Sequence, residues 1–261
     1  MTPPVPGNKD FAVLEARKIT VRFEGLEALS RLSFSIDPQR IVSIIGPNGA
    51  GKTTLLNAIT GVYPPHAGEI FFQGNPIAGL KPFQIATLGI TRSFQQAQLF
   101  MNMTVLENVM VGMHSRTTSG FLKGMLRTPS ERKEEGMIRE KSQGILEEFG
   151  LLSRAGDMAG HICILDQRRL EIARAMACRP ELLLLDEPAA GLTIREMEEM
   201  GNLILGLKEN GQTIILVEHN MRLVMAISDS LIVLHHGIKI GEGLPADIQK
   251  NQQVIEAYLG K

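Results

Sequence analysis

Short, continuous apolar runs that end in polar turn residues recur along the chain. They lie at 41–45, 182–185, 213–217 and 231–234, and they are rich in Leu or in β-branched residues. Runs of this length predict strands that are buried on both faces of a parallel sheet. Helical spacing of apolar positions fills the intervals at 168–178, 196–210 and 221–227. Strands that alternate with helices indicate an α/β fold with a mostly parallel sheet.

The first part and the middle of the chain have different patterns. Antiparallel strands around turns are predicted at 13–23, 32–36 and 69–73. From about residue 97 to residue 165 strand patterns are absent, and helices are predicted at 105–114 and 131–150. The residues between these two helices are rich in Gly, Ser, Thr and Pro. The middle of the chain is therefore predicted to be helical.

These patterns predict the domain organisation. We expect a flexible N-terminus at 1–12, where Pro and Gly are frequent. Residues 13–96 and 167–261 are predicted to form one α/β core with an antiparallel β part at its N-terminal side. Residues 97–166 are predicted to be a helical subdomain inserted into that core.

The composition limits the partners to be expected. The net charge is −1, so no basic surface indicates nucleic acid or anionic lipid. The chain has no Trp and two Tyr, which leaves few aromatic rings on which bases could stack. We therefore expect no nucleic-acid partner.

The two cysteines and the length of the apolar runs indicate the cellular compartment to be expected. Cys163 and Cys178 form no CxxC or Cys/His grouping of metal-binding spacing, and they are interpreted as reduced thiols. Residues 1–7 lack the basic and apolar regions of a secretory signal. No apolar run approaches the ~20 residues that span a bilayer. We expect a cytosolic protein whose membrane role, if any, comes through a partner.

A glycine-rich loop directly follows the run at 41–45. Residues 46–53 read Gly-Pro-Asn-Gly-Ala-Gly-Lys-Thr, which fits the pattern GxxxxGK[ST], and helical periodicity continues at 54–60. Glycines let backbone N–H groups surround a phosphate without a clashing Cβ, and the helix N-terminus adds partial positive charge. Lys52 would neutralise the β- and γ-phosphates, and the Thr53 hydroxyl would bind Mg²⁺. The phosphate-binding candidates are Gly46, Asn48, Gly49, Gly51, Lys52, Thr53 and Thr54.

Two acids, Asp186 and Glu187, follow the apolar run at 182–185. At the carboxyl end of a buried strand, Asp186 could hold Mg²⁺ through water, and Glu187 could orient and deprotonate an attacking water molecule. The alternative is that these acids only begin a turn. The phosphate loop upstream favours the catalytic interpretation.

Three further candidates are weaker when each is taken alone. Gln95 stands where the predicted core meets the helical insert, and His219 closes the strand at 213–217. A histidine at a strand end is more often a cap or a surface residue. Phe23 precedes the turn at Glu24 and could stack on adenine, although an aromatic residue in such a strand is more often part of a core.

Taken in this order, the elements resemble the ABC ATPase family from about residue 13 to residue 261. The resemblance implies a P-loop NTPase (RecA-like) core with ATP and Mg²⁺ as cofactors. Under it Phe23 stacks on adenine, and Gln95 is the Q-loop glutamine that touches Mg²⁺ and abuts a membrane partner. Asp186 becomes the Walker B acid and Glu187 the catalytic base. His219 becomes the switch histidine that hydrogen-bonds to the γ-phosphate.

Several segments resemble one importer subfamily more closely, the ATP-binding subunits of branched-chain amino acid importers. These are residues 92–100, 167–174 and 186–192, the ending Ala257-Tyr-Leu-Gly and the long segment at 115–130. The resemblance implies integral membrane permease subunits and a second ATP-binding subunit, either a copy or a paralogue, as partners. A substrate-binding protein would act indirectly. The implied location is peripheral, on the cytoplasmic face of the inner membrane.

The sequence departs from the family at the signature loop. Family members build each ATP site from one Walker A loop and the partner's signature, which usually reads Leu-Ser-Gly-Gly-Gln. Here the aligned residues 162–166 read Ile-Cys-Ile-Leu-Asp. Cys163 is a poorer donor than Ser, and Leu165 places a branched side chain where a glycine is expected. Thr193 is a milder departure, at a place where an acid or amide is usual.

Because of this departure, more than one interpretation of the function has to be kept. The leading interpretation is an ATPase that drives uptake of branched-chain or related amino acids. One alternative is an ABC-type subunit with weak or no hydrolysis, because its signature is altered. Another is a soluble ABC ATPase acting as a switch, although the chain has neither a second ATPase domain nor coiled-coil heptads.

Overall fold

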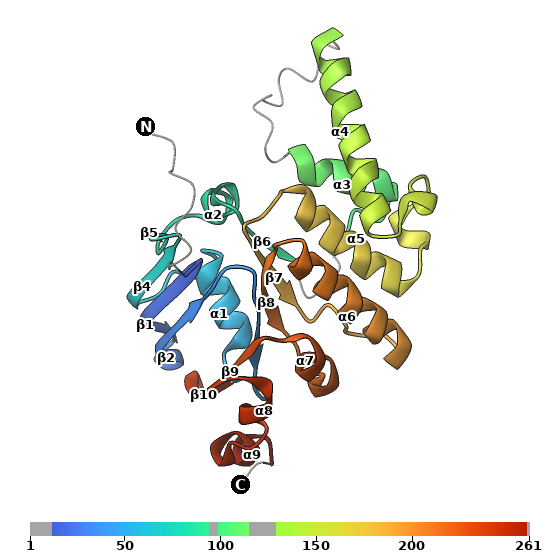
Figure 1. Ribbon diagram of the computed structural model, residues 1–261. Helices are drawn as coiled ribbons and strands as arrows, with labels where there is room; N and C mark the ends of the chain where they lie inside the picture. The colour runs from blue at the N-terminus through green and yellow to red at the C-terminus, as the bar shows by residue number, and fades with distance from the viewer. Residues whose placement is uncertain (1–11, 94–98, 115–128, 260–261) are drawn as a thin grey trace. The chain divides into compact units, whose positions relative to one another are not determined.

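The chain folds into two compact units, each of which is assembled from separate segments. The computed structural model describes residues 12–93, 99–114 and 129–259 (Figure 1). The first unit contains the chain up to Ile85, Leu207–Ile215 and the residues from Ser228 onward. The second unit contains Ala86–Gly206 and Leu216–Ile227.

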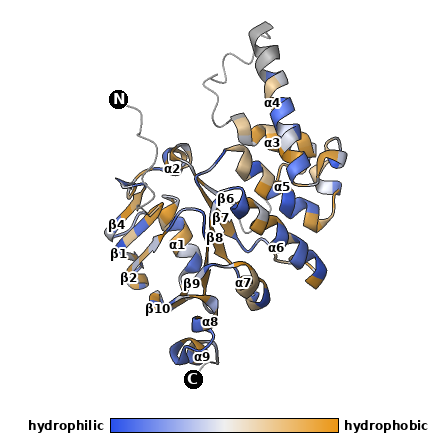
Figure 2. Ribbon diagram, viewed as in Figure 1, coloured by the Kyte–Doolittle hydropathy of each residue, from blue (hydrophilic) through white to orange (hydrophobic). Residues whose placement is uncertain are grey.

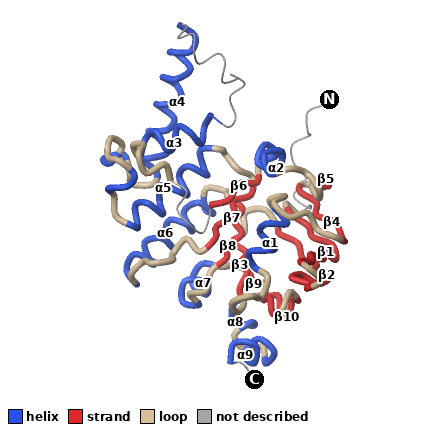
Figure 3. Tube along the Cα trace, turned by 180° about the vertical axis from the view of Figure 1, so that it is seen from behind, coloured by secondary structure: helices blue, strands red, loops and turns tan. Residues whose placement is uncertain are grey.

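The first unit contains an antiparallel sheet in the strand order β2-β1-β4-β5. Its strands are β1 (Leu14–Phe23), β2 (Leu26–Ile36), β4 (Ala67–Phe72) and β5 (Asn75–Pro76), which lie side by side in Figure 3. Leu14 pairs with Ile36 on one side and with Phe72 on the other, and all three side chains are buried. This pairing places the inner side chains of three strands in one apolar layer.

A second group of strands in the first unit supports the glycine-rich loop. β3 (Ile41–Ile45), all five residues of which are buried, runs parallel to β9 (Ser230–His235). β9 pairs with β10 (Ile238–Gly243) in the antiparallel sense. The helices that begin in this unit are α1 (Lys52–Ile59), α2 (Pro82–Leu88), α8 (Pro245–Ile248) and α9 (Gln252–Leu259). The loop thus leaves a fully buried strand and enters α1.

The second unit pairs two parallel strands with a set of helices. β6 (Ile90–Ser93) lies beside β7 (Leu182–Asp186) in parallel register. The helices are α3 (Val105–His114), α4 (Pro129–Glu148), α5 (Ile164–Ala177), most of α6 (Ile194–Glu209) and α7 (Met221–Ile227), with 3₁₀ turns at Leu152–Arg154 and Ala159–His161. β8 (Thr213–Val217) begins in the first unit and ends in the second.

Helices α3, α4 and α5 pack against one another within the second unit. Gly112 lets α3 approach α5 closely, because a Cβ there would lie 2.4 Å from the carbonyl oxygen of Arg174. The start of α3 carries a capping box, in which Thr104 Oγ1 accepts the N–H of Glu107 while Glu107 accepts the N–H of Thr104. The side chain of Asn108 is fully buried and bonds to the backbone of Phe100 and Thr104, which fixes the chain leading into α3.

The α/β fold with a parallel core, an antiparallel β part and a helical part is confirmed. The predicted strands at 41–45 and 213–217 and the predicted helix at 221–227 coincide with β3, β8 and α7. Figure 2 shows β7 and β8 as hydrophobic, in keeping with the apolar runs that predicted them. The two compact units do not follow the predicted domain boundaries at 97 and 166. The domain assignment therefore stays a prediction.

Asp229 joins three segments of the first unit at the start of β9. Its carboxylate accepts the N–H of Ile41 at 2.8 Å and the ammonium of Lys208 at 2.6 Å, and Arg40 lies at 3.5 Å. Partial burial acts to raise the pKa of Asp229, but the hydrogen bonds and charges of these neighbours outweigh it, so the pKa lies below its usual value. The ionised form of Asp229 therefore stabilises the fold.

We expect Asp229→Asn to lower the free energy of unfolding by about 1–3 kcal/mol near neutral pH. Because the folded-state pKa is depressed, the carboxylate's contribution is present above the unfolded value of ~4 and is lost as the pH falls through the folded value. Urea unfolding of parent and variant should therefore converge below about pH 4. As a control, Glu15→Gln removes an exposed ion pair with Arg17 and should leave stability nearly unchanged, because exposed ion pairs contribute little. A difference that grows in acid would contradict the assignment.

Candidate nucleotide-binding and catalytic residues

The loop at 46–51 needs glycine at two positions for different neighbours. Gly46 has φ +151°, and a Cβ there would lie 2.2 Å from the carbonyl oxygen of Leu234. Gly51 has φ +102°, and a Cβ there would lie 2.7 Å from the carbonyl oxygen of Ala28. Gly49 also has positive φ but faces open space. The loop is therefore packed against the unit at both ends and open in the middle.

Lys52 lies folded across this loop. Its side chain is buried, and Nζ donates hydrogen bonds to the carbonyl oxygens of Gly46 at 2.8 Å and of Pro47 at 3.1 Å. Thr53 is exposed, and Thr54 is half-buried. Among the described residues no side chain caps the N-terminus of α1. An ammonium beside backbone N–H groups without a side-chain cap is an arrangement that receives phosphate oxygens.

Phe23 lies at the end of β1 and outside the core. Its side chain is 40% exposed, and its ring makes an edge contact with Tyr63, with centroids 5.2 Å apart. Tyr63 is also exposed. The core alternative for Phe23 is therefore wrong, and a solvent-facing pair of rings is present in the first unit. Such a pair can receive a flat base.

Tyr258 in α9 is a residue near the loop that the sequence reasoning did not select. Burial raises the pKa of its hydroxyl, and a hydrogen bond with the backbone of Gly46 acts against this shift. The C-terminal helix thus reaches the first residue of the glycine-rich loop. The signal was present in the ending Ala257-Tyr-Leu-Gly, which marked the subfamily but not a contact.

In the second unit, β7 ends at Asp186, a buried carboxylate whose two oxygens differ in their hydrogen bonding. Oδ2 accepts a hydrogen bond from Arg92 Nη2 at 2.6 Å, and both side chains are buried. Oδ1 is buried as well, and no group in the described part of the chain hydrogen-bonds to it. A buried acceptor without a donor is unfavourable unless a ligand or water completes it. The oxygen fits a metal-bound water, so the donor set is compatible with Mg²⁺.

Glu187 follows in a left-handed conformation, with φ +50°. Such a φ is uncommon for a non-glycine residue and often occurs at functional sites. Its N–H donates to the carbonyl oxygen of Val217 at 2.8 Å, so the turn after β7 is tied to the end of β8. His219 Nδ1 lies 3.9 Å from Glu187 Oε2, and the imidazole is largely exposed. The second unit therefore brings Glu187 and His219 together.

Glu218 is buried and holds the residues around it in place, a role that sequence reasoning missed. Its Oε1 accepts the N–H of Ala189 at 2.9 Å. Its Oε2 accepts the N–H of His219 at 3.0 Å and that of Asn220 at 3.4 Å. One carboxylate therefore connects the turn after Glu187 to the loop that carries His219. A charge directly after a buried strand was the only sequence signal.

The altered signature forms the start of α5. Cys163 is the N-cap residue and is exposed, while Ile164 is 53% exposed and Leu165 is only 7% exposed. The branched side chain of Leu165, which stands where a glycine is expected, therefore packs inside the second unit instead of projecting from the signature. The exposed apolar side chain is that of Ile164.

Two further positions were predicted from the sequence, Thr193 and Gln95. Thr193 caps α6: its Oγ1 accepts the N–H of Glu196 at 3.4 Å, and Glu196 Oε2 accepts the N–H and the hydroxyl of Thr193, at 2.8 and 2.7 Å. This capping box accounts for the hydroxyl where an acid or amide was expected. Gln95 lies outside the described residues.

Comparison with known proteins agrees with this geometry. A family model described as "ABC transporter" matches residues 29–190, and one described as "Branched-chain amino acid ATP-binding cassette transporter" matches residues 239–261. The chain is 44% identical to the high-affinity branched-chain amino acid transport ATP-binding protein LivG of Escherichia coli (strain K12), over 95% of this chain and 98% of the relative. It is 43% identical to BraF of Pseudomonas aeruginosa, with the same shares.

Solved structures are similar over nearly the whole chain. A nucleotide-free ATP-binding cassette from an ABC transporter is 32% identical, with a TM-score of 0.84, over 96% of this chain and all of that one. The ADP conformation of the cassette MJ1267 gives the same identity, coverage and TM-score. The chain belongs to the ABC transporter ATP-binding family, in the group of the branched-chain amino acid transport ATP-binding proteins. It is an ATP-binding protein and an ATPase.

Proposed function

We propose that this ATPase drives the uptake of branched-chain or related amino acids as the ATP-binding subunit of an ABC importer. The observation that supports this most is the likeness to relatives named for branched-chain amino acid transport, over 95% of the chain. The C-terminal match at 239–261 supports the same group. No helix in the described ranges is long and apolar enough to cross a membrane. The proposed location is peripheral, on the cytoplasmic face of the inner membrane, through partner subunits.

Mass spectrometry of a gently solubilised native complex tests this proposal. The expected composition is this chain, integral membrane permease subunits and a second ATP-binding subunit, either a copy or a paralogue. A cell lacking the chain should lose uptake of labelled leucine or isoleucine, and a plasmid copy should restore it. A chain that purifies only with soluble proteins would favour the switch alternative. An assembled complex that does not hydrolyse ATP would favour the weakly hydrolysing alternative.

In the proposed site the nucleotide binds with Mg²⁺. Lys52 and the N–H groups of the glycine-rich loop would hold the phosphates, and Thr53 would offer its hydroxyl to the metal. Asp186 would bind a metal-coordinated water, and Gln95 is proposed as a further metal contact. Bound Mg²⁺ supplies positive charge to the β- and γ-phosphates. Phe23 would stack on the adenine.

Glu187 is proposed as the general base and His219 as the group that hydrogen-bonds to the γ-phosphate. The left-handed turn at Glu187 and the bond from its N–H to Val217 fix the backbone from which the carboxylate projects. His219 is exposed and lies within 4 Å of that carboxylate. Together these two side chains can orient a water molecule, and the carboxylate can accept its proton.

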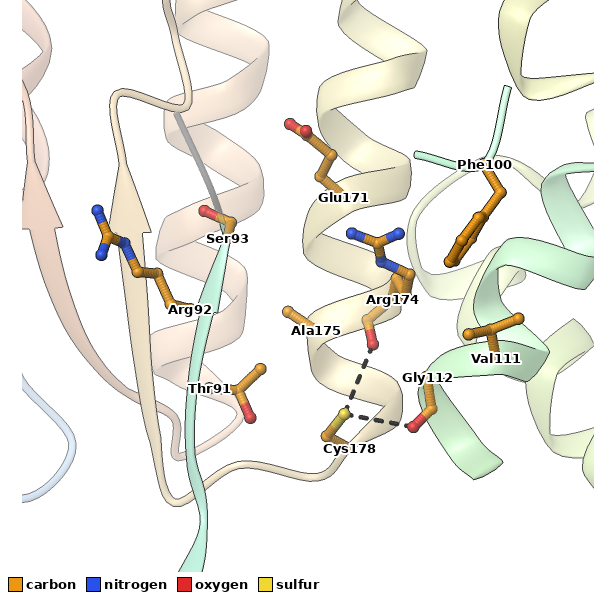
Figure 4. A pocket seen from close by; sticks show the side chains of 10 residues that line it. All are labelled: Thr91, Arg92, Ser93, Phe100, Val111, Gly112, Glu171, Arg174, Ala175 and Cys178. Atoms are coloured by element: carbon orange, nitrogen blue, oxygen red, sulfur yellow. Dashed lines mark hydrogen bonds between the residues drawn. The ribbon is translucent and has the colours of Figure 1, made fainter. Parts of the chain in front are cut away.

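A cavity in the second unit is the proposed contact for a membrane subunit (Figure 4). It has a volume of about 300 Å³. Phe100 and Val111 line it with apolar side chains that are 46% and 37% exposed, and the guanidinium of Arg174 lies over the Phe100 ring at 5.7 Å. Burial lowers the pKa of Arg174. An apolar wall beside a partly desolvated cation suits a short amphipathic helix that carries an acidic residue.

Cysteine crosslinking tests this contact. In a Cys163→Ala, Cys178→Ala background, we expect Phe100→Cys and Val111→Cys to crosslink to a membrane subunit in native vesicles. The control is Val62→Cys, a similarly exposed apolar position in the first unit that should give no such product. Equal products from all three positions would refute the assigned surface. Products with soluble proteins alone would count against the importer itself.

A further inference from the structure

Arg92 and Asp186 form a buried ion pair at the ends of two neighbouring strands. β6 and β7 run parallel with Arg92 opposite Leu184, so the arginine reaches along β7 to its last residue. The Nη2–Oδ2 distance is 2.6 Å, and the side chains are 7% and 1% exposed. Figure 4 shows the Arg92 side chain on the other side of β6 from Phe100 and Arg174. Arg92 is nevertheless one of the residues that line the proposed docking cavity.

The carboxylate of Asp186 is only half satisfied by this partner. Arg92 binds Oδ2, while Oδ1 is buried with no hydrogen-bond donor among the described residues. A group that arrives at Oδ1 with positive charge meets the guanidinium on the same carboxylate. Like charges repel strongly where water is excluded, so the second cation is bound less tightly while the first remains.

We propose that Arg92 is the resident counter-cation of Asp186 and sets the metal affinity of the nucleotide site by competing with Mg²⁺. Before the metal arrives, Arg92 balances a carboxylate that would otherwise lie buried without a counter-charge. Asp186 would help to hold Mg²⁺ when the nucleotide is bound, and the contact of the Arg92 guanidinium with this carboxylate would then weaken. Arg92 is thus a positioning residue. The inference rests on the proposed metal role of Asp186 and does not depend on transport.

Mn²⁺ binding to the ADP complex, followed by electron paramagnetic resonance, tests the competition directly. We expect Arg92→Gln and Arg92→Met to bind Mn²⁺ on the order of tenfold more tightly than the parent, because a neighbouring positive charge is removed. Arg92→Lys keeps the charge and should stay close to the parent. Arg168→Gln is the matched control, since Arg168 forms another ion pair of low exposure, with Glu171 at 3.1 Å. Affinity that is unchanged or weaker in Arg92→Gln would overturn the proposal.

A second measurement uses the parent protein and so does not depend on how well a variant folds. With ¹⁵N-labelled arginine, the side-chain signal of Arg92, assigned by its loss in Arg92→Lys, should be unaffected by ADP alone. Adding Mg²⁺ to the ADP complex should shift it or speed its hydrogen exchange. If adding Mg²⁺ to the ADP complex changes neither the position nor the hydrogen exchange of the Arg92 signal, the inference is overturned.

The variant Asp186→Asn distinguishes a failure of the proposed metal role of Asp186 from a failure of the proposed role of Arg92. If this variant loses Mn²⁺ affinity while Arg92→Gln changes nothing, the metal site stands and the role of Arg92 is wrong. If Asp186→Asn binds Mn²⁺ like the parent, the proposed metal role of Asp186 fails, and the inference fails with it.

Discussion

Glu187→Gln is expected to bind ATP as the parent does and to hydrolyse it about 10²–10⁴-fold more slowly. The amide fills the same space and can still hold a water molecule, but it cannot take the proton. The backbone that carries residue 187 is fixed by its N–H bond to Val217, so the substitution should not disturb the turn. Turnover is measured as phosphate release by the assembled complex, and binding by equilibrium titration with labelled ATP.

Lys52→Ala is the control, because it is expected to weaken nucleotide binding, which Glu187→Gln should leave intact. Lys52 lies across the glycine-rich loop and would meet the phosphates directly, so its loss should weaken nucleotide binding itself. If Glu187→Gln hydrolyses ATP at the parent rate in a transport-competent complex, another residue is the base. If both variants lose binding equally, the substitution at 187 has damaged the fold rather than the chemistry.

Leu165→Gly is expected to lower the free energy of unfolding by about 3–5 kcal/mol, the range for deleting a buried leucine and adding a glycine to a helix. The leucine is 7% exposed on the first turn of α5. Restoring the usual signature in full would therefore open a cavity inside the second unit. Denaturant unfolding measures the effect, and parent-like stability would show that the side chain is not buried in solution.

The exposed part of the signature can be repaired without that loss. Cys163→Ser with Ile164→Gly should change stability by less than about 1 kcal/mol, because both side chains face solvent. It adds a hydroxyl donor at the N-terminus of α5 and removes the one protruding apolar group. Since one preorganised donor contributes roughly 3–4 kcal/mol to a transition state, ATPase of the assembled complex should rise clearly. An unchanged rate would mean that the site borrowing this signature does not limit turnover.

Buried strands with uninterrupted apolar runs were predicted well from sequence. β3 and β8 were found to the residue, because every position in them is buried and a short apolar run rich in β-branched residues, ending in polar residues, marks the strand. β6 was missed because Ile90-Thr-Arg-Ser has a single apolar residue. Its buried arginine side chain is neutralised by Asp186, 94 positions later. A local pattern contains no information about such a partner.

The candidate site shows the same limit. The glycine-rich loop, Asp186 and Glu187 stood out because their residue types follow buried strands directly. The burial of Leu165 was not predicted, since a signature motif gives residue order but not the rotation of the helix that begins there. Tyr258 and Glu218 were missed for another reason. Their roles depend on contacts with Gly46 and Ala189, which are distant in sequence.

The three hydrogen bonds that backbone N–H groups donate to Glu218 affect how mutational data on this protein should be interpreted. A change at this position releases the backbone on both sides of the proposed base at once, without removing any group that touches nucleotide. A scan that scores only activity would rank Glu218 with Glu187 and His219 as a third catalytic residue. Amide hydrogen exchange measured at Ala189 and Asn220 in each variant would distinguish a structural residue from a catalytic one. Only loss of the structural carboxylate of Glu218 should increase exchange at both amides.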